Sequence, residues 1–171
     1  MTASGCGVMV KEYAWMMRDD PHYADKAARV SAATWDISEI LMAEKDVLAR
    51  LTLHPSPLTR KRIAYHPPCT LQHGQKRTGD VESLLTQAGF ELTPVAEKHL
   101  CCGSAGTYSI LQPEISSALK KRKLAHLQAG DPELIVTANI GCLTHLQSGS
   151  TVPIKHWIEI LDIALSRHTP Y

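Results

Sequence analysis

The sequence predicts an α/β fold, a mostly parallel sheet with flanking helices. Two observations carry this prediction. From residue 61 onward, short apolar runs alternate with segments whose apolar residues have helical spacing, as expected of strands joined by crossover helices. One of these runs, residues 134–138, is almost continuously apolar and fits a strand buried on both faces of a parallel sheet.

The amino-terminal part shows mainly helical signals. Asp20 and Pro21 suit the N-cap and the first position of a helix, and Asp36 suits the start of another. The expected order is a strand end and turn at residues 2–7, helices at 8–17 and 24–33, a helix that begins near Asp36, and a linker at 51–60.

The carboxyl-terminal part shows both periodicities, and Gly89 is expected as the residue that closes its first helix. A basic run within the long helix is expected to be a solvated face. The expected order is a strand at residues 61–65, a helix at 80–88, a strand at 90–95, a helix at 113–128, a strand at 134–138, a turn at 139–142, a strand at 152–154 and a helix at 156–165.

Composition excludes several function classes. The net charge of +1 offers no electrostatic basis for binding nucleic acid, and the aromatic share of 5% is too low for base-stacking platforms. No apolar run approaches the ~20 residues that span a bilayer, and no signal peptide opens the chain. A reducing, cytoplasmic location follows, where five cysteines favour metal or redox chemistry over disulfides.

The cysteines come after predicted strands. Cys69, the adjacent pair Cys101 and Cys102, and Cys142 each follow one, so a parallel sheet would bring them to the same edge. Adjacent cysteines rarely bridge each other, because so small a ring is strained. The turn after Cys102 lets backbone N–H groups approach sulfur and so favours thiolates. A shared metal site is expected, with Cys6 apart from it and with His66, His73 and His99 outside the ligand set.

The chain also resembles itself. Residues 2–6 parallel residues 137–142 with one residue added, and Glu39-Ile40-Leu41 parallels Glu159-Ile160-Leu161. The pattern predicts two units. Residues 1–56 would be the back half of a first cysteine-rich repeat plus a linker, with further sequence expected upstream, and residues 57–171 would be a complete repeat.

These motifs resemble the cysteine-rich CCG module, in which a cysteine, a Cys-Cys-Gly and a Cys-x-x-Cys follow one another at long spacings. The stretches HPPCTLQHG at residues 66–74 and CCGSAGTY at residues 101–108 are most similar to the glycolate oxidase iron–sulfur subunits, in their carboxyl-terminal part. One departure concerns the last motif, where His145 stands in place of the second cysteine. The other is in the first half-repeat, where Met9 does so after Cys6.

The resemblance implies an electron-transfer subunit of a glycolate oxidase or dehydrogenase, an oxidoreductase. This part would not be catalytic alone and would pass electrons from a flavin subunit that oxidises glycolate to glyoxylate. The complex could sit at the inner face of the membrane. A 4Fe-4S type cluster is implied at Cys69, Cys101, Cys102 and Cys142, with His145 as a further metal ligand. The chain lacks the ferredoxin-type cysteine runs that hold ordinary clusters.

Three alternatives stay open. The chain could belong to an iron–sulfur subunit of a related lactate or glycerol-3-phosphate dehydrogenase. A structural zinc site in an interaction module could use Cys69, one cysteine of the adjacent pair, Cys142 and His145. A thiol–disulfide enzyme could use the adjacent pair itself.

Overall fold

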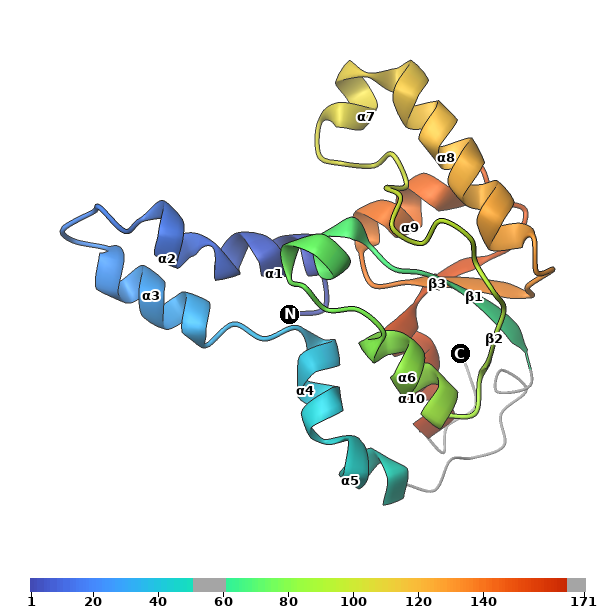
Figure 1. Ribbon diagram of the computed structural model, residues 1–171, viewed down its shortest axis with the longest axis horizontal. Helices are drawn as coiled ribbons and strands as arrows, with labels where there is room; N and C mark the ends of the chain where they lie inside the picture. Colours follow the sequence, from blue (N-terminus) through green and yellow to red (C-terminus); the bar gives the residue numbers. More distant parts are fainter. Residues whose placement is uncertain (51–60, 166–171) are drawn as a thin grey trace.

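The computed structural model describes residues 1–50 and 61–165. Within these residues lies a four-stranded sheet in the order β2-β1-β3-β4, in which every pairing is parallel (Figure 1). The α/β prediction is therefore confirmed. The strands are β1 (Arg62–His66), β2 (Glu91–Leu92), β3 (Leu134–Thr137) and β4 (Ile154–His156).

The edge strand β2 is shorter than the predicted strand at residues 90–95. The Thr93 amide still donates to the Ile63 carbonyl at 2.9 Å, which extends the ladder by one residue. Pro94 follows and has no N–H to donate, so pairing with β1 ends there.

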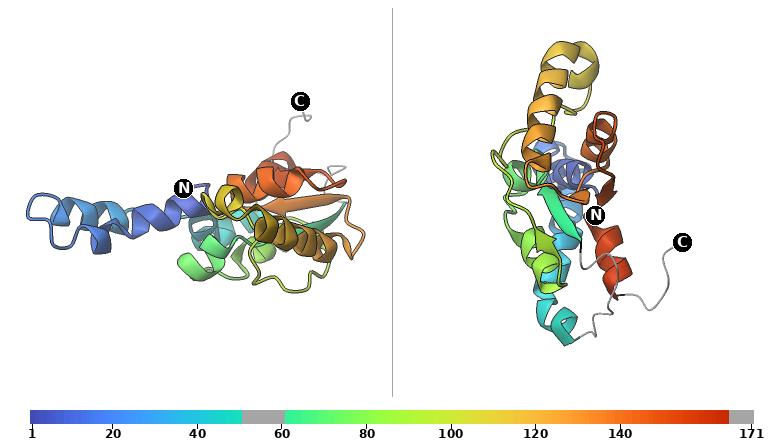
Figure 2. Two further views of the ribbon diagram at one scale, coloured as in Figure 1. Left: turned by 90° about the horizontal axis from the view of Figure 1, so that it is seen from above. Right: turned by 90° about the vertical axis from the view of Figure 1, so that its right-hand side faces the viewer.

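Two helices cover each face of the sheet (Figure 2). On one face α6 (Asp80–Gln87) and α10 (Trp157–Leu165) pack over an apolar core that includes Ile63, Val136 and the fully buried Trp157. On the other face α8 (Pro113–Gln128) and α9 (Ile140–Gln147) pack over a smaller core, which contains Cys102 and Cys142. Two of the cysteines are thus part of a packed face of the sheet.

Local signals account for many helix boundaries. The Asp36 side chain caps α4 (Ile37–Ala43), and the Asp36 amide donates to the Glu39 carboxylate, which completes a capping box. Gly89 adopts a φ of +87° after α6, as a closing glycine should. The expectation of a solvated basic face on α8 is wrong for Lys123, whose exposed fraction is 1%.

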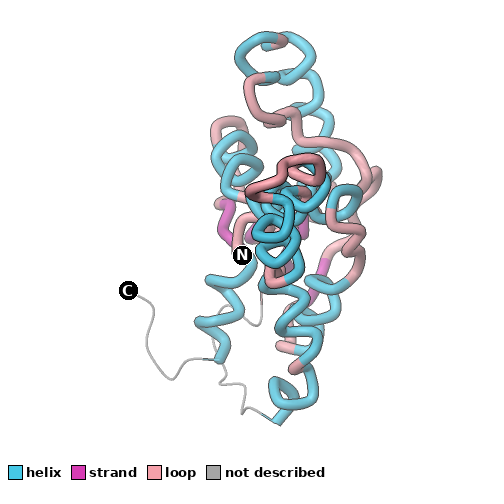
Figure 3. The backbone as a smooth tube through the Cα atoms, turned by 90° about the vertical axis from the view of Figure 1, so that its left-hand side faces the viewer, coloured by secondary structure: helices cyan, strands magenta, loops and turns pink. Residues whose placement is uncertain are grey.

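The amino-terminal helices form a projecting arm made of α1 (Ser4–Lys11), α2 (Tyr13–Met16) and α3 (Ala24–Ala32) (Figure 1). Seen from its tip, the arm lies in front of the sheet domain (Figure 3). The Ser31 hydroxyl ties α3 to the preceding helices, because it donates to the Val10 carbonyl and accepts from the Ala14 amide. Trp15 on the arm is 67% exposed.

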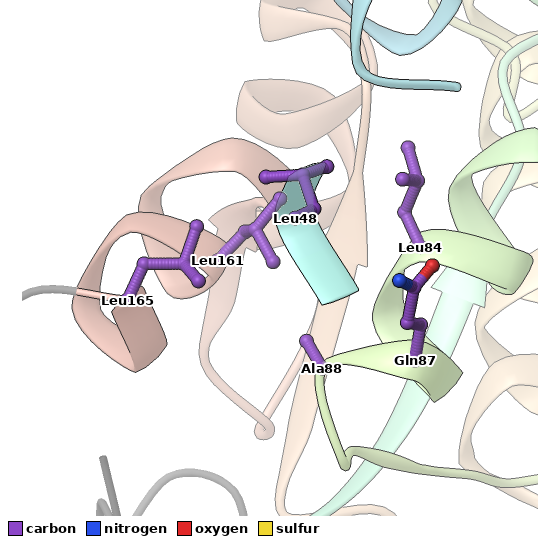
Figure 4. A pocket seen from close by; sticks show the side chains of 6 residues that line it. All are labelled: Leu48, Leu84, Gln87, Ala88, Leu161 and Leu165. Atoms are coloured by element: carbon purple, nitrogen blue, oxygen red, sulfur yellow. The ribbon is translucent and has the colours of Figure 1, made fainter. Parts of the chain in front are cut away.

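The next helices return to the sheet domain. Leu48 of α5 (Lys45–Arg50) lies in a small apolar pocket between α6 and α10, lined also by Leu84 and Leu161 (Figure 4). The Gln87 side chain donates to the Lys45 carbonyl and supports the same contact. The predicted linker at residues 51–60 lies outside the described residues. In the part of the chain that is described, no helix has the length and apolar character needed to cross a membrane.

Candidate metal centre

The sheet topology creates a crevice at one edge. The crossover after β1 leads to β2 on one side, and the crossover after β3 leads to β4 on the other side. Ligands bind where such a reversal occurs between adjacent strands of an open parallel sheet. His66 and Thr137 are register partners at the carboxyl ends of β1 and β3. Cys69 follows β1 directly, before the short π-helix η1 (Thr70–Gly74), and Cys142 lies in the first turn of α9.

A pocket of about 430 Å³ opens at this edge. The structure brings Cys69, Cys101, Cys102 and Cys142 together in its lining, as the strand order predicts. All are free thiols; Cys102 and Cys142 are buried, and the other two are half-buried. The site is therefore reachable from solvent on one side and packed against the sheet on the other.

Cys6 also lines this pocket and is exposed, so the expectation that it lies apart is wrong. The reason is the packing of the first turn of α1. The Ser4 hydroxyl is 2.8 Å from the Thr70 hydroxyl and accepts a hydrogen bond from the Asn139 side chain. These contacts fix the start of α1 beside both Cys69 and Cys142.

The two helices that begin at the pocket have matching starts. Cys6 is the third residue of α1, and Cys142 is the third residue of α9. The Asn139 side chain caps α9 by accepting from the Gly141 and Cys142 amides, so the predicted turn at residues 139–142 is instead a helix start. Two helix amino termini at one pocket favour negative charge there.

The loop that carries the adjacent cysteines is held by α8 at both ends. The buried Lys123 ammonium donates to the carbonyls of Glu97 and Lys98, at 2.7 and 3.4 Å, just before the pair. The Ser116 hydroxyl donates to the Gly103 carbonyl at 2.8 Å, just after it. The Gly103 amide donates to Cys101 Sγ at 3.3 Å, which is the predicted backbone approach to sulfur.

The thiols shift one another's pKa values in opposite directions. Hydrogen bonds from the Cys102 and Cys69 thiols, in that order, hold the pKa of Cys101 well below its usual range. The hydrogen bond that the Cys69 thiol donates to Cys101 is the largest cause that raises the pKa of Cys69, and burial is the second. Contacts with Cys101 and Cys142 raise the pKa of Cys102. The hydrogen bond from Cys102 also lowers the pKa of Cys142, to about 6. The contacts among the four thiols thus favour the thiolate form at Cys101 and Cys142 and the thiol form at Cys69 and Cys102.

His66, which was expected to lie outside the ligand set, lies beside the two buried cysteines of the centre. It has no exposed surface, and one of its ring nitrogens lies within 4.8 Å of the sulfurs of Cys102 and Cys142, which also lie that close to each other. The ring lowers the pKa of Cys142, but its contacts fall outside hydrogen-bond geometry and so mark proximity alone. The alternation of side chains along β1 could have predicted this position from the sequence. It places His66 on the same sheet face as Ala64, which belongs to the core that contains both cysteines.

His145, His73 and His99 lie outside this group. His145 Nε2 is 3.3 Å from the Ser116 hydroxyl, and burial lowers the His145 pKa. His145 is not in the three-donor group that His66 forms with Cys102 and Cys142. His73 Nε2 contacts the His99 carbonyl at 3.3 Å, on the outside of the cysteine loop.

The donor set fits a thiolate-bound metal or cluster. Thiolates together with an imidazole are ligands for iron–sulfur clusters and for zinc. Among the described residues, neither ring nitrogen of His66 nor the hydroxyl of Thr137 has a hydrogen-bond partner, although all three atoms are buried. Buried polar atoms without partners are rare, and an ion or cluster would give one of the two His66 nitrogens a partner.

Comparison with known proteins gives a consistent result. The cysteine-rich domain family CCG matches residues 63–147. The glycolate oxidase iron-sulfur subunit of Escherichia coli (strain K12) is 49% identical over 166 residues, which are 97% of this chain and 39% of that protein. The chain thus spans about two fifths of the length of that relative.

Two further relatives are covered more fully. The uncharacterized protein YkgE of Escherichia coli is 31% identical over 165 residues, which are 93% of this chain and 67% of that protein. Lactate utilization protein A of Shouchella clausii is 29% identical over 171 residues, which are 95% of this chain and 68% of that protein.

Proposed function

Because the chain belongs to the cysteine-rich CCG domain family, we propose that it forms part of an iron–sulfur subunit that transfers electrons within an oxidoreductase complex. The observation that carries the proposal is the convergence of five free thiols on one pocket at the carboxyl edge of the sheet, four of which are the predicted cluster ligands. When bound, an iron–sulfur cluster supplies a one-electron carrier. The residues of this chain hold the donors and set their charge.

Each cysteine has a role that follows from its place. Cys69, Cys101, Cys102 and Cys142 are proposed as the thiolate donors of a 4Fe-4S type cluster. The resemblance implies His145 as a further metal ligand, but His145 would first have to leave its contact with Ser116, so it is one of two candidate imidazoles, and His66 is the other. The amino termini of α1 and α9 and the Gly103 amide favour the anionic state of the centre. The proposal assigns no catalytic residue to this chain.

The substrate and partners come from the relatives. The name of the most identical relative above is glycolate oxidase iron-sulfur subunit, which favours glycolate as the 2-hydroxy acid oxidised by the complex. We propose a flavin-containing subunit as electron donor and peripheral association of the complex with the cytoplasmic face of the membrane. The relative named lactate utilization protein A makes lactate the alternative substrate.

The chain's organisation also enters the proposal. Residues 57–171 would be a complete CCG repeat, and residues 1–56 the back half of another plus a linker. The matching helix starts at Cys6 and Cys142 support this division, because an internal repeat should place equivalent cysteines at equivalent helix positions.

The test is the metal content of the chain prepared anaerobically. We expect iron and acid-labile sulfide, a brown colour, and an electron paramagnetic resonance signal after reduction. Cys102→Ser should lose far more iron than Cys6→Ser, because Cys102 is buried among the other thiols and Cys6 is exposed. Colourless protein with one zinc per chain would support a structural zinc site instead, which the compact group of His66, Cys102 and Cys142 favours as the second candidate. A metal-free chain would contradict both.

A further inference from the structure

His66 is the polar residue at the centre that the thiol chemistry does not use. It ends β1, and alternation along the strand places it on the same face as Ala64, the face covered by α8 and α9. Its ring is completely buried in the apolar layer that contains Cys102 and Cys142. A histidine in such a place needs a partner for its ring nitrogens, because burying an unsatisfied polar group costs about 1–3 kcal/mol.

The described residues do not supply that partner. Both ring nitrogens have negligible exposed surface and no hydrogen bond of acceptable geometry among these residues. The Thr137 hydroxyl, on the register partner of His66 in β3, is buried and unpaired in the same way. Three buried polar atoms without a hydrogen-bond partner thus lie at the carboxyl ends of two adjacent strands. A metal ion bound there would give one His66 nitrogen the partner that it lacks.

The spacing of the donors indicates a metal. Bonds of about 2.3 Å from zinc to sulfur and about 2.0 Å from zinc to nitrogen keep the ligands of one ion within roughly 4 Å of each other. One His66 nitrogen and the sulfurs of Cys102 and Cys142 already lie within 4.8 Å of one another. The donors therefore need to close by only about 1 Å, an adjustment that side-chain rotation can supply.

The alternative imidazole is engaged elsewhere. His145 has its Nε2 beside the Ser116 hydroxyl, and the same nitrogen would lie 3.2 Å from a Cβ built on Gly103. It packs against the back of the cysteine loop, with Ser116 as its polar partner. His66 has no such engagement.

We propose that His66, Cys102 and Cys142 form a three-donor metal site, in which His66 rather than His145 supplies the imidazole. The inference deepens the proposed function, on which it rests for the identity of the native metal. The donor geometry does not depend on a cluster, so a single divalent ion can test it.

The experiment titrates the reduced, metal-free chain with Co²⁺ and with Zn²⁺ against a chromophoric chelator. We expect His66→Ala to weaken binding by more than about 100-fold, since losing a group that only supports a ligand costs about 10–100-fold. His145→Ala should weaken it far less, and His22→Ala, on the exposed turn before α3, not at all. His66→Cys should restore affinity and add sulfur-to-cobalt charge-transfer absorption, which a residue that merely fills space would not do.

The outcomes separate the two proposals. If the chain never acquires iron and sulfide but its Co²⁺ affinity depends on His66, the proposed function fails and the three-donor site stands. A second outcome is that the unmodified chain loads a cluster, but the His66→Ala variant binds Co²⁺ as tightly and shows the same histidine-nitrogen coupling in its electron paramagnetic resonance spectrum. That outcome overturns the three-donor site and leaves the proposed function standing. A larger loss for His145→Ala than for His66→Ala would also overturn it.

Discussion

The glycine of the Cys-Cys-Gly turn gives the sharpest mechanical test of how the centre is built. Gly103 has a φ of +95°, a region that side chains rarely occupy, and a Cβ added there would lie 2.4 Å from the Ser116 carbonyl oxygen on α8. The Gly103→Ala substitution therefore brings backbone strain of about 1–2 kcal/mol and an overpacking cost of about 1–3 kcal/mol. Together these costs amount to about 2–5 kcal/mol of lost stability.

The control is Gly89, which closes α6. It has a nearly equal φ of +87°, but a Cβ there would meet no atom within 4 Å. Gly89→Ala should cost only the strain, about 1–2 kcal/mol. The difference between the two variants thus isolates the close approach of the cysteine turn to α8.

Urea unfolding of the reduced, metal-free chain measures both costs, and thermal unfolding should show a loss of about 2–4 °C for each kcal/mol. Gly103→Ala should also increase the rate at which Cys102 reacts with an alkylating reagent, because the turn must move away from Ser116 to relieve the clash. Equal destabilisation by the two substitutions, with unchanged Cys102 reactivity, would refute the claim that α8 positions the turn.

Three further predictions follow from other contacts. Lys123→Met removes the ammonium that two loop carbonyls accept from, so it should cost about 2 kcal/mol in urea unfolding, whereas Lys121→Met on the exposed side of α8 should cost almost nothing; similar losses would contradict a specific role for Lys123. Burial tends to raise the pKa of Glu39, but the hydrogen bonds from Lys11 and from the Asp36 amide together lower it by more, so the net pKa lies below its ordinary value of 4.5. Stability from Glu39 is therefore present above pH 4.5 and lost as pH falls through the lowered pKa, so Glu39→Gln should show a weaker acid-induced loss in unfolding curves from pH 7 to 3; an unchanged pH profile would argue against this pair. Native-state hydrogen exchange should protect residues 134–138 strongly and residues 1–50 weakly, because the arm has little buried surface; equal protection would contradict the half-repeat interpretation.

Sequence periodicity was sufficient to predict the strands of the sheet, but it did not predict how the chain continues at their carboxyl ends. The largely apolar run at residues 134–138 predicts β3, because such a run is typical of a strand whose two faces are both buried in a parallel sheet. Asp36 and Gly89 were predictable because capping and a positive φ depend on local chemistry. Asn139 was ambiguous, because the same side chain that forms a turn also caps a helix.

The residues that sequence reasoning misplaced all depend on contacts between distant segments. Lys123 is buried because its ammonium reaches carbonyls at Glu97 and Lys98, and no helical pattern reveals where a loop will present acceptors. Cys6 reaches the pocket through contacts of Ser4 with Thr70 and Asn139. The convergence of the other cysteines was predictable in outline because each follows a strand of a parallel sheet, whereas the exact place of Cys101 and Cys102 also depends on the contacts of their loop with α8.

The two supports of the centre act on different cysteines. Cys101 and Cys102 lie in a loop without regular structure, so their positions depend on Ser116 and Lys123 of α8, which hold the loop after and before the pair. Cys6 depends instead on the first turn of α1. A perturbation of α8 is therefore expected to displace Cys101 and Cys102, whereas a perturbation of the first turn of α1 is expected to displace Cys6 on the exposed side of the pocket.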